Sequence, residues 1–179
     1  MKLKYIATIC LGCSLSVPQY AFADGNTETE VEFSGFVDGS YNYLRQSNLF
    51  TSGVYDRVYD LNENGFTLQQ AAGTISYLPK EGLGIFLNGM VGRDAIVSNA
   101  YGMGTWVSSP DFGVDVTQAF LQFAHSNLAL DLGKFTTLNG AETIAPITDT
   151  NFSRSILFGY AGPFTTTGAR ATYTPNDKL

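Results

Sequence analysis

The chain has 179 residues and carries 16 acidic against ten basic side chains, a formal net charge of −6 at pH 7. This acidic balance argues against a nucleic-acid partner, which requires a clustered excess of Lys and Arg. Charged residues make up only 15% of the chain, below the roughly 25% usual in soluble domains, whereas aromatic residues make up 13%. No segment after residue 23 approaches about 18 consecutive apolar residues, so the sequence predicts no membrane-spanning helix.

Residues Met1–Ala23 have the three parts of a secretory signal peptide: two early lysines, a short apolar core and an A-x-A site at Ala21–Ala23. The apolar core is shorter than the roughly 20 residues that a bilayer-spanning helix needs. We therefore expect cleavage before Asp24 and export of the mature chain. A lipoprotein signal ending at Cys13 is the alternative.

Both cysteines of the chain, Cys10 and Cys13, lie inside this predicted signal. The mature chain would then contain no disulfide and would depend on hydrogen bonds and burial alone. Two of the ten basic residues also lie in the signal, so eight would remain against 16 acidic residues, a net charge of −8.

Apolar and polar residues alternate along several segments of the mature chain, and this period of two predicts β-strands with one apolar face. In Val114–Phe135, for example, Leu121 and Phe123 share one face while Gln122 faces the other way. The alternation slips near Gln69, which predicts a β-bulge. The predicted strands are Val31–Tyr43, Phe66–Tyr77, Leu83–Gly92, two strands joined by a turn at His125–Asn127 within Val114–Phe135, and Phe164–Tyr173.

The connections between these strands are alternately long and short. The long ones are 44–65, 93–113 and 136–163, and the short ones are 78–82, 125–127 and 174–178. Short turns at one end and long loops at the other are typical of an up-and-down transmembrane β-barrel. Tyrosines near both strand ends would belong to its aromatic girdles. We therefore predict an all-β, antiparallel barrel, with a soluble secreted β-sandwich as the alternative.

Six strands are too few to close a membrane barrel, which needs about eight. Open sheet edges in lipid would leave backbone groups without hydrogen-bond partners. We therefore expect residues 24–179 to form the N-terminal part of an outer-membrane barrel domain whose remaining strands follow Leu179.

Several stretches resemble the porin-2 type of β-barrel porin found in Gram-negative outer membranes. They are FSGFVDGSYNY at 33–43, RVYDLNENGFTLQQA at 57–71, LDLGKFTTLNGAETI at 130–144, and NFSRSILFGYAGPFTTTGARATY at 151–173 followed by NDKL. The resemblance covers nearly the whole mature chain and implies a porin-like outer-membrane barrel. Gly73 departs from it, since the family usually has a large apolar residue there.

The polar side chains of lumen parity are the candidates for a pore wall. The residues predicted to line or constrict the pore are Glu32, Asp38, Gln118, Gln122, Asp131, Arg154 and Arg170. Further charges at strand ends near the same mouth are Arg93, Asp94, Lys134 and Glu142. Opposed acids and bases across a constriction would select solutes by charge. Each of these charges could instead be a solvated rim residue.

The connection Asp149–Pro163 is the most informative loop. Asn151 or Ser153 could cap a short helix over Arg154–Tyr160, because both residue types are favoured at the N-cap. We expect the apolar patch Ile156–Phe158 to dock on the barrel. One hypothesis is a loop that narrows the lumen and carries Arg154 into it, and the other is a loop with a purely structural role on the rim.

Other motifs are weaker. Asp60, Asn62 and Asn64 match the first half of a calcium loop, but position 12 is Ala71 rather than the bidentate Glu such loops use. A polar external loop is the simpler interpretation. The single histidine, His125, lies in a turn where no nucleophile and orienting carboxylate can be arranged around it. We therefore expect no enzymatic activity and no metal or other cofactor.

These observations favour a porin-like channel in the cell outer membrane through which small hydrophilic solutes diffuse passively. The expected partners are outer-membrane lipid and those solutes, and a homo-oligomer is left open. A non-conducting barrel that acts as an anchor or adhesin, and a soluble β-sandwich binding protein, are the alternatives.

Overall fold

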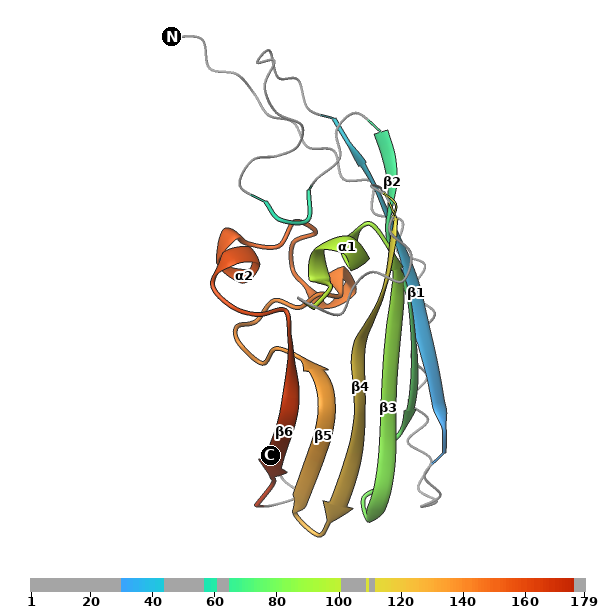
Figure 1. Cartoon of the computed structure of the whole chain (residues 1–179), viewed down its shortest axis with the longest axis vertical. Coiled ribbons are helices and arrows are strands. Elements are labelled where there is room, and N and C mark those ends of the chain that lie inside the picture. The colour runs from blue at the N-terminus through green and yellow to red at the C-terminus, as the bar shows by residue number, and fades with distance from the viewer. Residues whose placement is uncertain (1–29, 44–56, 61–64, 101–108, 110–111, 176–179) are drawn as a thin grey trace.

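A computed structural model describes residues 30–43, 57–60, 65–100, 109 and 112–175. Six antiparallel strands form one sheet in which each strand is hydrogen-bonded to its neighbours in sequence (Figure 1). The strands are β1 (Glu32–Asn42), β2 (Gly65–Tyr77), β3 (Gly82–Gly92), β4 (Gly113–His125), β5 (Leu128–Thr136) and β6 (Thr165–Tyr173). The predicted strands are thus confirmed, with ends that differ by one residue. Within the described residues there is one sheet rather than two facing sheets, so the β-sandwich alternative is wrong.

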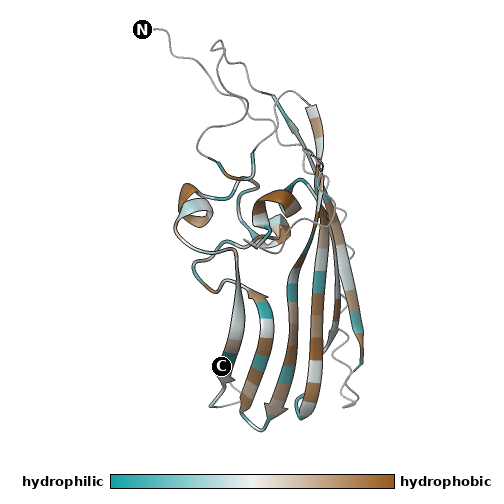
Figure 2. Ribbon diagram, in the orientation of Figure 1, coloured by the Kyte–Doolittle hydropathy of each residue, from teal (hydrophilic) through white to brown (hydrophobic). Residues whose placement is uncertain are grey.

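The two faces of the sheet differ in chemistry, as the alternating bands along the strands show in Figure 2. One face, here called the outer face, exposes large apolar side chains, among them Phe33, Leu83, Leu121, Leu130 and Leu132. The opposite, inner face buries polar and charged side chains, among them Asp38, Ser40, Gln70, Asp115, Thr117 and Asp131. This arrangement reverses that of a soluble protein, whose apolar faces turn inward.

Two β-bulges interrupt the regular pairing. Asp38 pairs with Gln70 while the next residue, Gly39, pairs with Leu68, so Gln69 is the extra residue of β2. This is the bulge that the sequence predicted. A second shift on β4 leaves Thr117 as the extra residue and was not predicted. Each bulge turns a further polar side chain toward the inner face. The burial of Gln69 and Thr117, which are almost completely covered, shows this.

The short turns β2–β3 and β4–β5 lie at the same end of the sheet and are joined by a hydrogen bond. Glu81, between β2 and β3, accepts from the backbone nitrogen of Ser126 at 2.8 Å and lies 3.0 Å from His125 Nδ1. His125 is the last residue of β4, and Ser126 follows it in the turn to β5. The hydrogen bond from Ser126 and the contact with His125 lower the pKa of the Glu81 carboxyl. His125 thus has a structural contact in the turn.

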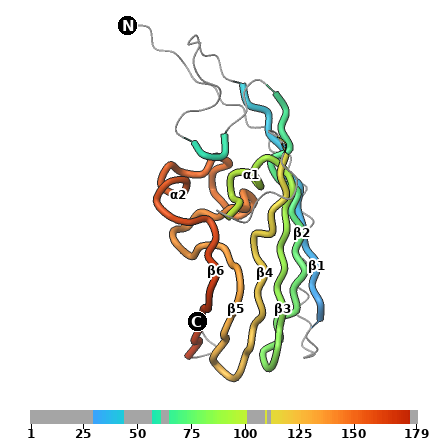
Figure 3. The backbone as a smooth tube through the Cα atoms, in the orientation of Figure 1, coloured from blue at the N-terminus to red at the C-terminus, as the bar shows by residue number. Residues whose placement is uncertain are grey.

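The described parts of the connections β3–β4 and β5–β6 fold over the inner face at the other end of the sheet (Figures 1 and 3). They contain α1 (Asp94–Ser98), a 3₁₀ turn at Pro146–Thr148 and α2 (Ile156–Tyr160). A small apolar core of Met90, Ala95 and Ile144 lies between these connections and the sheet, with Phe158 packed against it. Among the described residues no helix is long and apolar enough to span a bilayer.

The predicted details of the last loop need correction. The helix begins later than expected, and its N-cap is Ser155, whose hydroxyl accepts from the backbone nitrogen of Phe158, rather than Asn151 or Ser153. The apolar patch does not dock as a unit, since Ile156 and Leu157 are exposed. Phe158 alone packs inward, on the core.

Candidate pore-lining site

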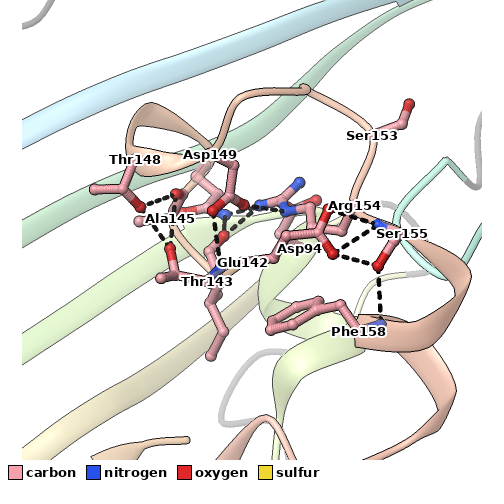
Figure 4. Close-up of polar contacts among 12 residues, drawn as sticks. Asp94, Glu142, Thr143, Ala145, Thr148, Asp149, Ser153, Arg154, Ser155 and Phe158 are labelled. Carbon is pink, nitrogen blue, oxygen red and sulfur yellow. Dashed lines mark hydrogen bonds and ion pairs between the residues drawn. The ribbon is translucent and has the colours of Figure 1, made fainter. Parts of the chain in front are cut away.

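Arg154, in the connection between β5 and β6, lies at the centre of a cluster of polar contacts (Figure 4). Its Nη2 donates to Asp94 Oδ2 at 3.0 Å and to the carbonyl oxygen of Ile144. Its Nε lies 3.9 Å from Asp149 Oδ2, and its guanidinium carbon lies 4.3 Å above the Tyr59 ring. The guanidinium is therefore held by two carboxylates, a carbonyl and an aromatic face, and its side chain is only 2% exposed.

Asp94 is the other centre of this cluster. It is the first residue of α1, and the bulged β2 strand brings Gln70 next to it, so that Gln70 Nε2 donates to Asp94 Oδ2 at 2.8 Å. The same amide donates to the Ile144 carbonyl oxygen at 2.7 Å. Burial raises the pKa of the Asp94 carboxyl to about 6, although the Arg154 charge opposes the rise. Burial also raises the pKa of Asp149.

Hydrogen bonds to nearby and to distant residues fix the loop that carries Arg154. The Ser155 backbone nitrogen donates to both oxygens of Glu142, at 2.9 and 3.1 Å (Figure 4). The Thr143 backbone nitrogen donates to Asp149 at 2.8 Å and so closes the turn that contains the 3₁₀ segment. Arg57 donates to the Arg154 carbonyl oxygen at 2.6 Å. These bonds connect the loop to a distant part of the chain and hold the guanidinium in place.

Two further ion pairs lie on the inner face. Lys134 Nζ donates to Asp115 Oδ1 at 3.1 Å, and both side chains are less than 10% exposed. From the sequence, Lys134 was placed among the charges at the strand ends. The pairing of β4 with β5 continues in one register to Lys134, which lies opposite Ala119. The Lys134 side chain reaches the buried Asp115.

The second pair is Arg170 with Asp131, which are partners across β5 and β6. Arg170 donates from Nε and Nη2 to Asp131 Oδ2 at 2.9 and 2.7 Å. Gln122 donates to the other oxygen of the same carboxylate at 3.0 Å. The Arg170 guanidinium also lies 4.8 Å from the Phe135 ring centroid. Arg170 remains 25% exposed, so this cation is the more accessible of the two arginines.

The structure places all the predicted lining residues of the strands on the inner face but does not gather them at one point. Asp131, Gln122 and Arg170 form one cluster, Arg154 belongs to the other, and Glu32 is exposed at the start of β1. Arg154 contacts buried groups rather than open space, which differs from the expected position in the lumen. The pore-lining role of these residues remains a prediction.

Sequence reasoning missed the partners of these charges. Asp94, Asp115 and Asp149 hold the arginine and lysine side chains, and Gln70 donates to Asp94. Of these four residues only Asp94 was noted in the sequence, as a rim charge. The parity slip at Gln69 could have indicated that Gln70 turns inward, whereas no local signal relates Asp94 to a residue 60 positions away.

A cavity of about 410 Å³ lies between the inner face of the sheet and the turn 143–148. Strand residues on one side and Thr143, Ile144 and Thr148 on the other line it. It is adjacent to the Arg154 cluster, since Gln70 and Ile144 belong to both.

The candidate calcium loop gains no support. Asp60 is buried and accepts from the Ser153 hydroxyl at 2.6 Å, while Asn62 and Asn64 lie outside the described residues. In the part of the chain that the structure describes, no three His, Cys, Asp or Glu side chains are grouped as metal ligands.

Comparison with known protein families matches residues 30–179 to the family described as "Putative beta-barrel porin-2, OmpL-like". The chain belongs to this family. The resemblance found in the sequence is thereby confirmed. No curated protein and no solved structure matches the chain.

Proposed function

We propose that the protein is an outer-membrane channel for the passive diffusion of small hydrophilic solutes. The observation that carries this proposal is the inverted sheet, apolar on the outer face and polar on the inner face. Leu121, Leu130 and Leu132 are 56, 40 and 61% exposed, and neighbouring inward positions such as Asp131 are buried. Only a surrounding apolar medium makes such exposure favourable, and a polar interior allows water-soluble molecules to pass.

The mechanism involves binding and diffusion without a chemical step. Hydroxyl, amide and ion-paired side chains on the inner face replace part of the solute's hydration as it passes. The long connections narrow the passage, because α1 and the turn 143–148 pack on the inner face rather than projecting away from it.

A non-conducting barrel is the second candidate, and the same packing favours it. Connections that fill the interior and are fixed by ion pairs as buried as Arg154–Asp94 could also block passage. The family membership is compatible with both candidates.

Conductance measurement distinguishes them. The native protein, extracted from the outer membrane and inserted into a planar bilayer in KCl, should give stepwise current increases of uniform size. A protein that inserts, as judged by resistance to alkaline extraction, but produces no steps would contradict the channel proposal and favour the non-conducting barrel. A protein that stays in the aqueous phase would contradict both.

A further inference from the structure

The cavity of about 410 Å³ on the inner face has no ionisable side chain in its lining. This is unexpected on a face that carries so many charges. The lining consists of hydroxyl, amide and apolar groups from β1 to β5 and from the turn 143–148. Its volume falls within the range of roughly 300–1,000 Å³ that small-molecule sites occupy.

The polar groups of this lining offer both donors and acceptors. Gln118 accepts a long hydrogen bond of 3.5 Å from the backbone nitrogen of Thr136, and its amide NH₂ has no partner among the described residues. Asn88 donates to Thr74 at 2.7 Å and accepts from Thr117, so these three form a connected polar strip across neighbouring strands. Hydroxyls and amides of this kind can exchange hydrogen bonds with solute hydroxyl groups.

The apolar part of the lining complements these groups. Phe36, Met90 and Ile147 contribute an aromatic ring and flexible aliphatic surface to the same cavity. A molecule that has hydroxyls along its edges and C–H groups on its faces would satisfy both kinds of surface at once. Carbohydrate rings have this chemistry, whereas a hydrocarbon lacks the hydroxyls and a small ion lacks the apolar faces.

The basic side chains near the cavity are already engaged with carboxylates. Arg154 is paired with Asp94 and Asp149, and Lys134 is paired with Asp115. No ionisable side chain lines the cavity, so a charged solute there would lose hydration without gaining an opposite charge in direct contact, and that loss is unfavourable. A neutral solute does not incur this cost.

We propose that this cavity is a binding site for uncharged polyhydroxylated solutes of monosaccharide size on the path through the channel. The inference rests on the proposed function and makes it more specific, since it assigns selectivity to neutral hydrogen-bonding groups rather than to a field between opposed charges. Gln118 and Thr136 are the residues whose polar atoms we expect to contact the solute hydroxyls.

The test uses the native protein in proteoliposomes and three pyranose solutes of similar size: glucose, glucuronate and glucosamine. These probes differ mainly in charge. Uptake of radiolabelled glucose should exceed that of both charged compounds. Glucose should also block the KCl current of the channel transiently and saturably, because a binding site is occupied at high concentration.

Near-isosteric variants identify the site. Gln118→Leu and Thr136→Val each remove hydrogen-bonding capacity with little change in volume, and each should weaken the glucose block by roughly two- to tenfold, as expected for one hydrogen bond. Thr172→Val is the matched control, because Thr172 lies on β6 and does not line the cavity. It should leave the glucose block unchanged.

The outcomes separate the two claims. KCl conductance with equal uptake of all three solutes, or with preference for a charged one, would overturn the binding-site inference and leave the channel proposal intact. Equal effects of Thr172→Val and Thr136→Val on the glucose block would also overturn the binding-site inference and leave the channel proposal intact. Absence of KCl conductance in an inserted protein would overturn the channel proposal and the inference with it.

Discussion

Arg154 and Asp94, 60 residues apart in the chain, form an ion pair of 3.0 Å whose side chains are only 2 and 0% exposed. The pair joins the loop between β5 and β6 to the start of α1 between β3 and β4. It therefore fixes two of the long connections over the inner face, and it is the contact on which the shape of the interior depends most.

The first prediction concerns the stability of this pair. Arg154→Met should lower the free energy of unfolding by about 3–5 kcal/mol, because it leaves the buried Asp94 without its cation. Adding Asp94→Asn should recover part of that loss, since the uncompensated charge disappears. Urea titration of the single and the double variant in lipid vesicles measures these free energies of unfolding. His125→Gln, which alters an exposed contact with Glu81, is the control and should change stability little. Equal effects of Arg154→Met and His125→Gln would contradict the assigned role.

The second prediction concerns pH. Because burial raises the pKa of Asp94 to about 6 from an unfolded value of 3.8, the folded protein binds a proton more readily than the unfolded chain between these values. The stabilisation linked to this proton is complete below pH 3.8 and is lost as the pH rises through about 6. The free energy of unfolding should therefore increase from pH 7 to pH 5.

Asp94→Asn tests this assignment, because it removes the titrating group and should reduce the slope between pH 5 and 7. Burial also raises the pKa of Asp149, so this residue should still give the variant a smaller slope of the same sign. Glu81 has a lowered pKa, so its stabilisation is present above pH 4.5 and is lost only below that value, outside this range. An unchanged slope in the variant would show that Asp94 is not the group responsible.

The third prediction uses two glycines that face each other across β5 and β6, Gly133 and Gly168. Gly133 has a φ of +145°, and a Cβ there would lie 2.2 Å from the Ala119 carbonyl oxygen. Gly133→Ala should destabilise the protein by about 1–3 kcal/mol or more through backbone strain alone. Gly168→Ala meets no atom within 4 Å and should be neutral or slightly stabilising. Similar urea midpoints for the two variants would contradict the close approach at Gly133.

The fourth prediction concerns the outer face. Leu130→Arg should cost roughly 2–4 kcal/mol of unfolding free energy in a bilayer if this position lies near the midplane, because lipid solvates a guanidinium poorly. Thr172→Arg on the inner face of the adjacent strand is the matched control and should cost much less. Equal costs in vesicles would show that lipid does not cover the outer face selectively.

The strands could be predicted because alternation is a local signal. Leu128, Leu130 and Leu132 mark the outer face without knowledge of any partner, and the slip near Gln69 marks a bulge. The bulge at Thr117 has a similar signal, because Val114 and Val116 share one parity whereas Leu121 and Phe123 share the other, so it could also have been predicted.

The interior could not be predicted in the same way. Asn151, Ser153 and Ser155 can all act as helix N-caps, and only the position of Glu142, which fixes the Ser155 backbone nitrogen, selects the last of them. The pairing of Arg154 with Asp94 depends on how two loops pack on the sheet, and neither loop has a periodic pattern.

The central claim is that lipid covers the outer face and water reaches the inner face, and site-directed spin labelling along β4 tests it most directly. Both cysteines of the given sequence lie in the predicted signal peptide, so a cysteine introduced at each position from Phe120 to Phe123 would be the single labelling site within residues 24–179. In bilayers, labels at Leu121 and Phe123 should collide mainly with oxygen, and labels at Phe120 and Gln122 should be protected from oxygen relative to them. Ready access of a water-soluble nickel complex to both Leu121 and Phe123 would contradict the account.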